Sequence, residues 1–440
     1  MPELPGSLRT IVSLLRPAFT TPSFNTFSWL IYGFIAQLGE GTVTGMWQAA
    51  RLAGRLHHSR GHDFFSRARW STDKVGLRLL EGVVALLVPA GAPLRLALDD
   101  TLFRRSGKKV WGSFLHHDPT AGGEHAVRQG NSWVVVGLLV ELSFMHRPVC
   151  LPVIFRLYRP TRPDAIRPSR PELGRALVDL VCERFPTRRV EILADAAYAT
   201  KSFCGLPARA SITMRLRRDA ALYAPAPPKS GTRGRPRVKG EKLAPLAELA
   251  DAPGAAWQPH TLTRYGATHT VFVLAIDCLW YRVLAGEPVR VVLVREATTT
   301  HGFDVALLST DHDTDAAQVV CRYAMRWAIE VAFQDAKQVI GVGQARNRSE
   351  RAVMRTVPFG FFCQTLIIVW YSQGDTAVRD VERRRRNAPW YLQKKTPSFQ
   401  DMLATCRREL IRTQYLNAPT PPLPAQEITP PLSPREDLAA

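Results

Sequence analysis

The chain has 440 residues, of which 46% are hydrophobic and 22% are charged, as in a soluble globular protein of two or three domains. Its 58 Lys and Arg against 38 Asp and Glu give a net charge of +20, which favours a polyanionic partner, most often nucleic acid. Seven scattered cysteines without a CxxC pair argue against disulfides and a zinc site. The longest apolar run, 359–371, is too short to cross a bilayer and predicts a buried core helix; we expect no signal peptide and no membrane partner.

Residues 1–92 are predicted to form a helical N-terminal domain that binds DNA. Apolar residues recur at helical spacing in 24–38 and 75–88. Between them, two short helical patterns broken at glycines fit either a helix-turn-helix motif or an ordinary helical bundle. In the first case DNA would face a set of basic side chains: Arg51, Arg55, His58, Arg60, Arg67 and Arg69.

From residue 93 to 210 the pattern changes to buried strands, which we interpret as the first part of a catalytic core. Strands are predicted at 95–101, 132–142, 148–158 and 189–194, with a helix at 172–185, so the fold class is α/β, a mixed sheet flanked by helices. Three acids, Asp99, Asp100 and Asp195, end apolar strands, where ligand chemistry gathers in α/β sheets. Strand alternation sends Asp99 and Asp100 to opposite faces, so only one of them can join Asp195 in a metal site.

The remaining chain is predicted as a β-rich insertion (211–300), a second part of the core (301–375), a basic C-terminal helical region (376–416) and a disordered Pro-rich tail (417–440). Within the insertion, Arg235 in a Gly-Arg-Pro sequence either enters a minor groove or belongs to a flexible loop. In the C-terminal region, the runs 382–386 and 390–395 interleave cations with aromatics, as nucleic-acid surfaces or solvated charge runs do.

One predicted helix, Asp313–Ile340, carries the most specific pattern. Tyr323, Arg326, Glu330 and Lys337 follow the spacing Y-x2-R-x3-E-x6-K, which places them within an arc of about 60° on a continuous helix. Such a stripe offers cations for phosphates and an acid for a metal. An ordinary ion pair between Arg326 and Glu330 is the alternative.

Together these residues make the chain resemble the insertion-sequence DDE transposases, over about residues 20–415. The first-acid motif is LALDDT, the second is ILADAAY, and the third acid lies in the spacing above. The resemblance implies a ribonuclease-H-like core with a β-strand insertion between the second and third acids. It also implies that Asp100, Asp195 and Glu330 are catalytic and bind two Mg²⁺ ions, with Mn²⁺ as an alternative. The motif favours Asp100 over Asp99.

By the same resemblance, the substrate is double-stranded DNA, both transposon terminal inverted repeats and target, cut and joined by a homodimer in the bacterial cytoplasm at the nucleoid. Tyr323, Arg326 and Lys337 would bind phosphates, with further DNA contacts from Arg235 and Arg346. Trp327 would stack on a flipped base or pack in the core, and Trp280 or Trp257 is the candidate second aromatic. A transposon-derived DNA-binding protein without activity and a structure-specific ribonuclease-H-like nuclease are the alternatives.

Overall fold

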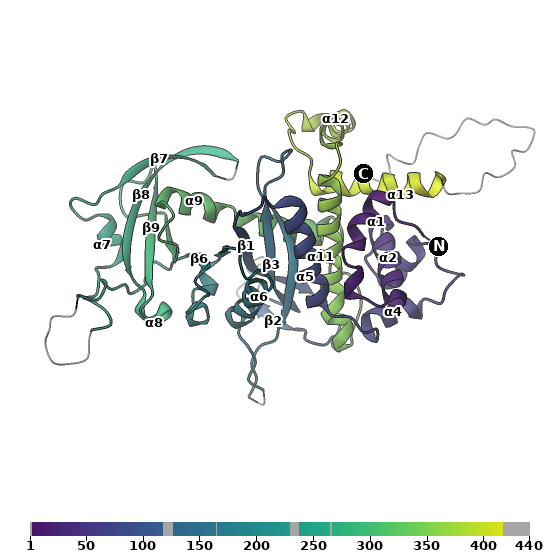
Figure 1. The fold of residues 1–440 in the computed structure, drawn as a ribbon, viewed down its shortest axis with the longest axis horizontal. Helices are drawn as coiled ribbons and strands as arrows, with labels where there is room; N and C mark the ends of the chain where they lie inside the picture. The colour runs from purple at the N-terminus through teal and green to yellow at the C-terminus, as the bar shows by residue number, and fades with distance from the viewer. Residues whose placement is uncertain (1, 118–125, 164, 229–236, 265, 417–440) are drawn as a thin grey trace, which may run out of the picture.

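The computed structural model describes residues 2–117, 126–163, 165–228, 237–264 and 266–416. Arg235 and the predicted Pro-rich tail lie outside these residues. Figure 1 shows a large sheet in the middle of the molecule, a group of N-terminal helices beyond one side of it, and a β-rich region at the opposite end. The N-terminal helices are α1 (Gly6–Ser13), α2 (Thr21–Ala36), α3 (Val43–Ala49), α4 (Ser59–Ser66) and α5 (Thr72–Leu87).

Ten strands form one mixed sheet in the order β2-β3-β1-β5-β6-β10-β9-β8-β7, with β4 also paired to β3. Their bounds are β1 (Leu94–Arg104), β2 (Phe114–His117), β3 (Val127–Val140), β4 (Val149–Tyr158), β5 (Val190–Ala194), β6 (Ala210–Arg215), β7 (Gln258–Arg264), β8 (Ala267–Leu279), β9 (Pro288–Glu296) and β10 (Val305–Ser309). The β1–β5 and β5–β6 pairs are parallel, and the other pairs are antiparallel. This mixed sheet with its flanking helices confirms the predicted α/β class and is consistent with a ribonuclease-H-like fold.

The two faces of the sheet are covered by different helices, and the alternation along β1 shows which residues meet which helix. Leu98 lies under Gly174 of α6 (Arg170–Arg184), so even-numbered residues of β1 face α6. The ring of Phe103 lies 5.8 Å from that of Phe361 in α11 (Glu350–Ser372), so odd-numbered residues face the other layer. Helix α10 (Trp327–Gln338) belongs to this second layer.

The N-terminal helices share their core with the catalytic part of the chain. The ring of Phe359 in α11 packs against Phe27 at 5.8 Å and Phe65 at 5.3 Å, and Arg355 donates to three backbone carbonyls of residues 65–70. Helices α3 and α4 are joined by residues 50–58, a longer connection than the three- or four-residue turn of a helix-turn-helix motif. Among the described residues, α11 is the one helix long and apolar enough to cross a membrane, but 94% of its apolar window is buried, as predicted for a core helix.

The predicted insertion is continuous with the core sheet. Strands β7, β8 and β9 form an antiparallel unit, and β9 pairs with β10, which pairs with β6. Strand β6 was expected to begin the insertion at residue 211, but its parallel pairing with β5 places it in the core sheet. Two short helices, α7 (Leu246–Ala250) and α8 (Tyr281–Leu284), lie between these strands in sequence. The chain ends, within the described residues, with α12 (Ala377–Asn387) and α13 (Phe399–Leu416).

The helix predicted over 313–340 is two helices, and this corrects the expectation of one continuous stripe. Helix α9 (Ala316–Ala324) ends one residue before Met325, and α10 starts at Trp327. At the junction, the N–H of Ala328 donates to the carbonyl of Met325 and the N–H of Ile329 to that of Arg326, which are tight i→i+3 bonds. The physical reason is that α9 packs on the strands of the insertion, whereas α10 packs on the main core.

Candidate active site at the ends of β1 and β5

Asp99 and Asp195 follow neighbouring positions on two parallel strands. The register of β1 and β5 pairs Leu98 with Ala194, and Asp195 continues β5 in an extended conformation (φ −79°, ψ 169°). Residues in register on adjacent strands project to the same face, so the two carboxylates share one side of the sheet. Burial is the main cause that raises the pKa of Asp99, and the charge of Asp195 adds to this effect, as it also does for Asp100.

Asp100 points to the opposite face, where α6 lies. Its carboxylate is 3.1 Å from Nε of Arg170, and it accepts hydrogen bonds from the hydroxyls of Ser132 at 3.4 Å and Tyr198 at 3.5 Å. Burial raises the pKa of Asp100, and Arg170 is the strongest opposing influence. Asp99 and Asp100 therefore project to opposite faces of the sheet, as predicted. Asp99 lies on the face covered by α10.

Arg326 connects Asp99 to Glu330. One terminal nitrogen of its guanidinium donates to Asp99 at 2.7 Å, and the other donates to Glu330 at 2.6 Å. The Arg326 side chain is only 12% exposed and that of Asp99 19%, so water screens this pair weakly. Burial raises the pKa of Asp99 to about 7 in spite of the opposing charge of Arg326. The predicted ion pair between Arg326 and Glu330 thus forms, and it includes Asp99 as a third member.

Tyr323 and Lys337, the other two residues of the Y-x2-R-x3-E-x6-K spacing, lie at different positions around Arg326. Tyr323 lies on α9, with its ring 5.8 Å from the Arg326 guanidinium, and burial raises its pKa to about 12. The charge of Asp195 also raises the pKa of Tyr323, which places this phenol near the second acid. Lys337 is in the last turn of α10, where its ammonium lies 5.4 Å from the ring of Phe103.

The three tryptophans considered for base stacking are not equivalent. Trp327 is 49% exposed, so it is not a core residue, and it borders a cavity of about 310 Å³ on the side of α10 away from Glu330. Trp280 is buried in the core. Trp257 is held by an indole hydrogen bond to the carbonyl of Ala250 and lies under the guanidinium of Arg295 at 4.3 Å. Burial therefore covers the ring of Trp280, and Arg295 covers one face of the ring of Trp257.

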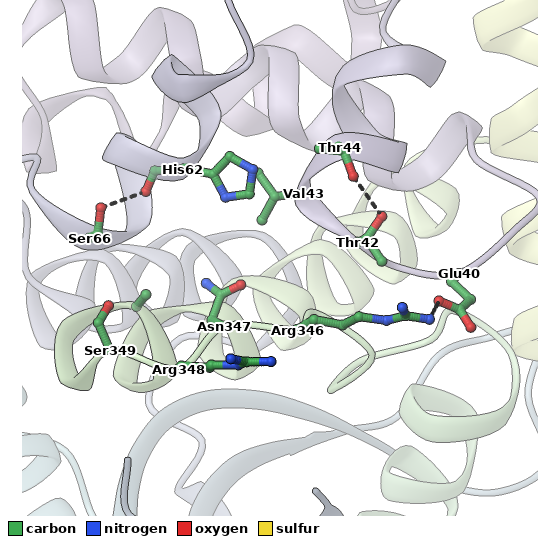
Figure 2. Close-up of a pocket in the computed structure, with 11 residues that line it drawn as sticks. Glu40, Thr42, Val43, Thr44, His62, Ser66, Arg346, Asn347, Arg348 and Ser349 are labelled. Atoms are coloured by element: carbon green, nitrogen blue, oxygen red, sulfur yellow. Dashed lines mark hydrogen bonds and ion pairs between the residues drawn. The ribbon is translucent and has the colours of Figure 1, made fainter. Parts of the chain in front are cut away.

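A second cavity, of about 610 Å³, lies where the loop after α10 meets the N-terminal helices. Figure 2 shows Arg346 and Arg348 on one side of it and the ring of His62 on the other. Arg346 reaches across to Glu40, and burial lowers the pKa of His62. Arg346, a predicted DNA contact, is thus exposed at a basic hollow, on the loop that follows α10.

The acids fit the divalent ions that the resemblance implies in their chemistry but not in their arrangement. Asp99, Asp195 and Glu330 supply carboxylate oxygens, the donors that Mg²⁺ and Mn²⁺ prefer. Within the described part of the chain, however, no three His, Cys, Asp or Glu side chains are grouped closely enough to share an ion. The guanidinium of Arg326 stands between Asp99 and Glu330 where such a group would form. The carboxylate oxygens suit Mg²⁺ or Mn²⁺ as donors, but in this structure the guanidinium of Arg326 supplies the positive charge between Asp99 and Glu330.

Sequence reasoning missed the contacts on the α6 side. Arg170 opens α6 and stacks over Tyr158 at 4.2 Å while it reaches Asp100, and no sequence motif marked it. Tyr198 had a signal, because it is the tyrosine of ILADAAY, but only the fold shows that its fully buried hydroxyl approaches Asp100.

Comparison with known proteins identifies the family of the chain. The family model described as DDE superfamily endonuclease matches residues 15–274, which is more than half of the chain. The matched span includes β1, β5 and their acids and ends within β8, so Glu330 rests on the geometry described above. No curated protein matches the chain. Members of this superfamily cut DNA and depend on divalent metal ions. The acids of β1 and β5 and the family match lead to the same conclusion, that the chain belongs to the DDE superfamily of endonucleases.

Proposed function

We propose that the protein is an insertion-sequence transposase that binds terminal inverted repeats and catalyses metal-dependent strand cleavage and strand transfer by a cut-and-paste route. The observation that carries the proposal is that Asp99 and Asp195 lie on the same side of the sheet, and that Arg326 joins Asp99 to Glu330 on that side. This face also holds Tyr323, so acids and phosphate-binding groups lie together. We place the protein in the cytoplasm, acting as a homodimer on double-stranded DNA.

We assign the first acid to Asp99, although the motif favours Asp100. Two physical arguments support this choice. Asp99 is in register with Asp195 and bonded through Arg326 to Glu330, whereas Asp100 is neutralised by Arg170 on the other face. A ligand set needs its oxygens on one side of the sheet, and Asp100 is not on the side of Glu330.

In this proposal Asp99, Asp195 and Glu330 would hold Mg²⁺ or Mn²⁺. Bound there, such ions neutralise the phosphodiester and lower the pKa of the attacking water or 3′-hydroxyl. The protein's own part is positioning. Tyr323 and Arg326 bind the phosphate beside the scissile bond, and Lys337 binds a phosphate further along the strand.

Arg326 has to exchange partners in this scheme. In the structure its guanidinium is bound by two carboxylates, and a phosphate offers it a similar bidentate acceptor. When DNA takes this guanidinium, Asp99 and Glu330 lose their cation and become available as ligands. Arg346, at the basic hollow of Figure 2, and Arg235 are proposed as further DNA contacts.

The test is nicking of a supercoiled plasmid that carries the DNA flanking the coding sequence, with Mg²⁺ and purified full-length protein. We expect wild-type protein to cut at the element ends, while Asp99→Asn, Asp195→Asn and Glu330→Gln bind the same DNA without cutting it. Asp100→Asn is the matched control, because it changes the neighbouring carboxylate on the opposite face and should keep measurable nicking. Loss of nicking in Asp100→Asn with retention in Asp99→Asn would reverse the assignment, and cutting by Glu330→Gln would refute the proposed chemistry.

A further inference from the structure

The C-terminal region presents large apolar side chains to solvent at one place. Trp390 is 77% exposed and Leu392 70% exposed, and Tyr391 between them is also exposed. They follow α12 in a single turn of 3₁₀ helix, Pro389–Tyr391. We call α12 and residues 388–395 the Trp390 surface. In Figure 1 α12 stands at the edge of the molecule beside α13, away from the strands of the insertion. A cluster of exposed aromatic and aliphatic side chains, unlike a single one, marks a contact site.

This surface is held in place by buried anchors. Lys394 forms a 3.0 Å ion pair with Asp401, whose side chain is 7% exposed, and Arg385 donates to the backbone carbonyl of Lys394 at 2.9 Å. The guanidinium of Arg384 lies 5.5 Å from the ring of Tyr391. The exposure of Trp390 therefore does not come from a loose chain end. A fixed aromatic side chain loses little conformational entropy when a ligand stacks on it.

The charge of this surface is strongly positive. Residues 377–395 contain seven Lys and Arg and two acids, which gives 7 − 2 = +5. One of the two acids, Asp380, is buried and paired with Arg408, so it contributes little to the outer face. Within the described residues, Arg379, Arg386 and Lys395 are exposed and form no ion pair. Arginines at the end of α12 also offset the helix dipole, but this explains neither Arg379 nor the exposed Trp390.

We propose that the Trp390 surface binds DNA at an unpaired nucleotide, whose base face is open. Trp390 stacks on the base while Arg379, Arg386 and Lys395 contact the flanking phosphates. A base inside a duplex has both faces covered, whereas single-stranded DNA offers a face at every base, which suits aromatic stacking next to cations. The inference rests on the proposed function, since strand cleavage and transfer act on DNA in which nucleotides become unpaired.

The test is fluorescence anisotropy of full-length protein in EDTA, with a labelled single-stranded oligonucleotide and a blunt duplex of the same length and unrelated sequence. We expect Trp390→Ala to weaken single-strand binding about tenfold, the effect of losing one stacked base, and to change duplex binding much less. Trp390→Phe should recover most of the loss. Leu38→Ala is the matched control, because Leu38 is 69% exposed on the N-terminal side and should have no effect. Joint replacement of Arg386 and Lys395 by Gln should lower the salt dependence by about two counterions.

Two outcomes would overturn the inference. One is unchanged single-strand affinity in Trp390→Ala. The other is a change in the sedimentation coefficient of the DNA-free protein on the same substitution, which would make this surface a contact between copies of the chain. Because binding is measured without metal and without cleavage, failure here is distinguishable from failure of the plasmid nicking assay.

Discussion

Replacement of Arg326 by Gln tests how the acids are held before DNA arrives. The change removes charge-assisted bonds of 2.7 Å to Asp99 and 2.6 Å to Glu330, each worth about 1.5–3 kcal/mol in a typical protein. Asp99 would be left without its cation, but it can limit the loss by taking up a proton. In the wild type, Asp99 has a pKa of about 7 and has released its proton by pH 8, which contributes about 1.4 kcal/mol of stability at that pH. Without the charge of Arg326 the pKa is higher, so the variant keeps the proton and lacks this contribution. We therefore expect the free energy of unfolding to fall by about 2–3 kcal/mol at pH 8 and by about 1 kcal/mol at pH 6, where Asp99 already holds a proton.

The same variant should respond differently to metal. In the wild type without DNA, Arg326 stands between the carboxylates, so Mg²⁺ should raise the melting temperature very little. In Arg326→Gln the carboxylates lack a cation, and a bound ion at about 100 times its Kd would add about 2.7 kcal/mol of stability. Thermal melts with and without Mg²⁺, in the absence of DNA, measure this difference. Adding DNA to the wild type should produce the same gain in metal response.

The matched control is Arg322→Gln. Arg322 lies one turn earlier, on α9, is 11% exposed, and pairs with Asp311 at 2.8 Å and Glu191 at 3.4 Å. Its loss should also destabilise the fold, because two buried carboxylates lose one of their two arginine partners and keep only Arg189 and Arg95. It should leave the response to Mg²⁺ unchanged. An equal rise in melting temperature of the two variants with Mg²⁺ would refute the inference that Arg326 takes the place of the metal ion between the carboxylates.

Two further predictions concern stability. Burial raises the pKa of Asp335 to about 6, so the folded protein holds this proton more tightly than the unfolded chain, and the free energy of unfolding falls as pH rises from about 4 to 6. Asp335→Asn should therefore be more stable than wild type at pH 8, by up to about 3 kcal/mol, and equal to it below about pH 4 in urea titrations. A Cβ on Gly33 would lie 1.9 Å from the carbonyl oxygen of Met46, so Gly33→Ala should force α2 and α3 apart and cost about 2–4 kcal/mol in thermal unfolding. Gly6→Ala, with nothing within 4 Å of its Cβ, should not destabilise, and equal melting of the two glycine variants would contradict this packing argument.

Much of the sheet could be predicted because buried strands leave a direct mark in the sequence. The Val- and Leu-rich runs that became β3, β4 and β9 have buried central residues, so their apolar composition indicates strands. Strand β2, of four residues with a polar end, has no such mark. The continuity of the insertion with the core sheet depends on the pairing of β9 with β10, and pairing partners are not visible in one sequence.

The candidate site was predictable in kind but not in detail. The spacing from Tyr323 to Lys337 identified the helix and its acid, but both halves have helical periodicity, so the break at Met325 left no signal. The choice between Asp99 and Asp100 depends on which residue of β5 lies alongside, which is a property of strand register. A motif specifies the residue types, whereas their side of the sheet comes from pairing.

The junction between α9 and α10 also determines what length changes the chain can accept. Helix α9 is seated on the insertion through Val319 and Val320, whereas α10 is seated on the core through Ile329. A change in the length of the β7–β8 hairpin leaves the packing of both helices intact, so it should not change the distance between the acids. A single residue added between Tyr323 and Arg326 would instead turn one helix against the other by about 100° and separate the phenol from the guanidinium. The spacing from Tyr323 to Lys337 therefore determines how α9 and α10 are oriented relative to each other, in addition to which residue types are present.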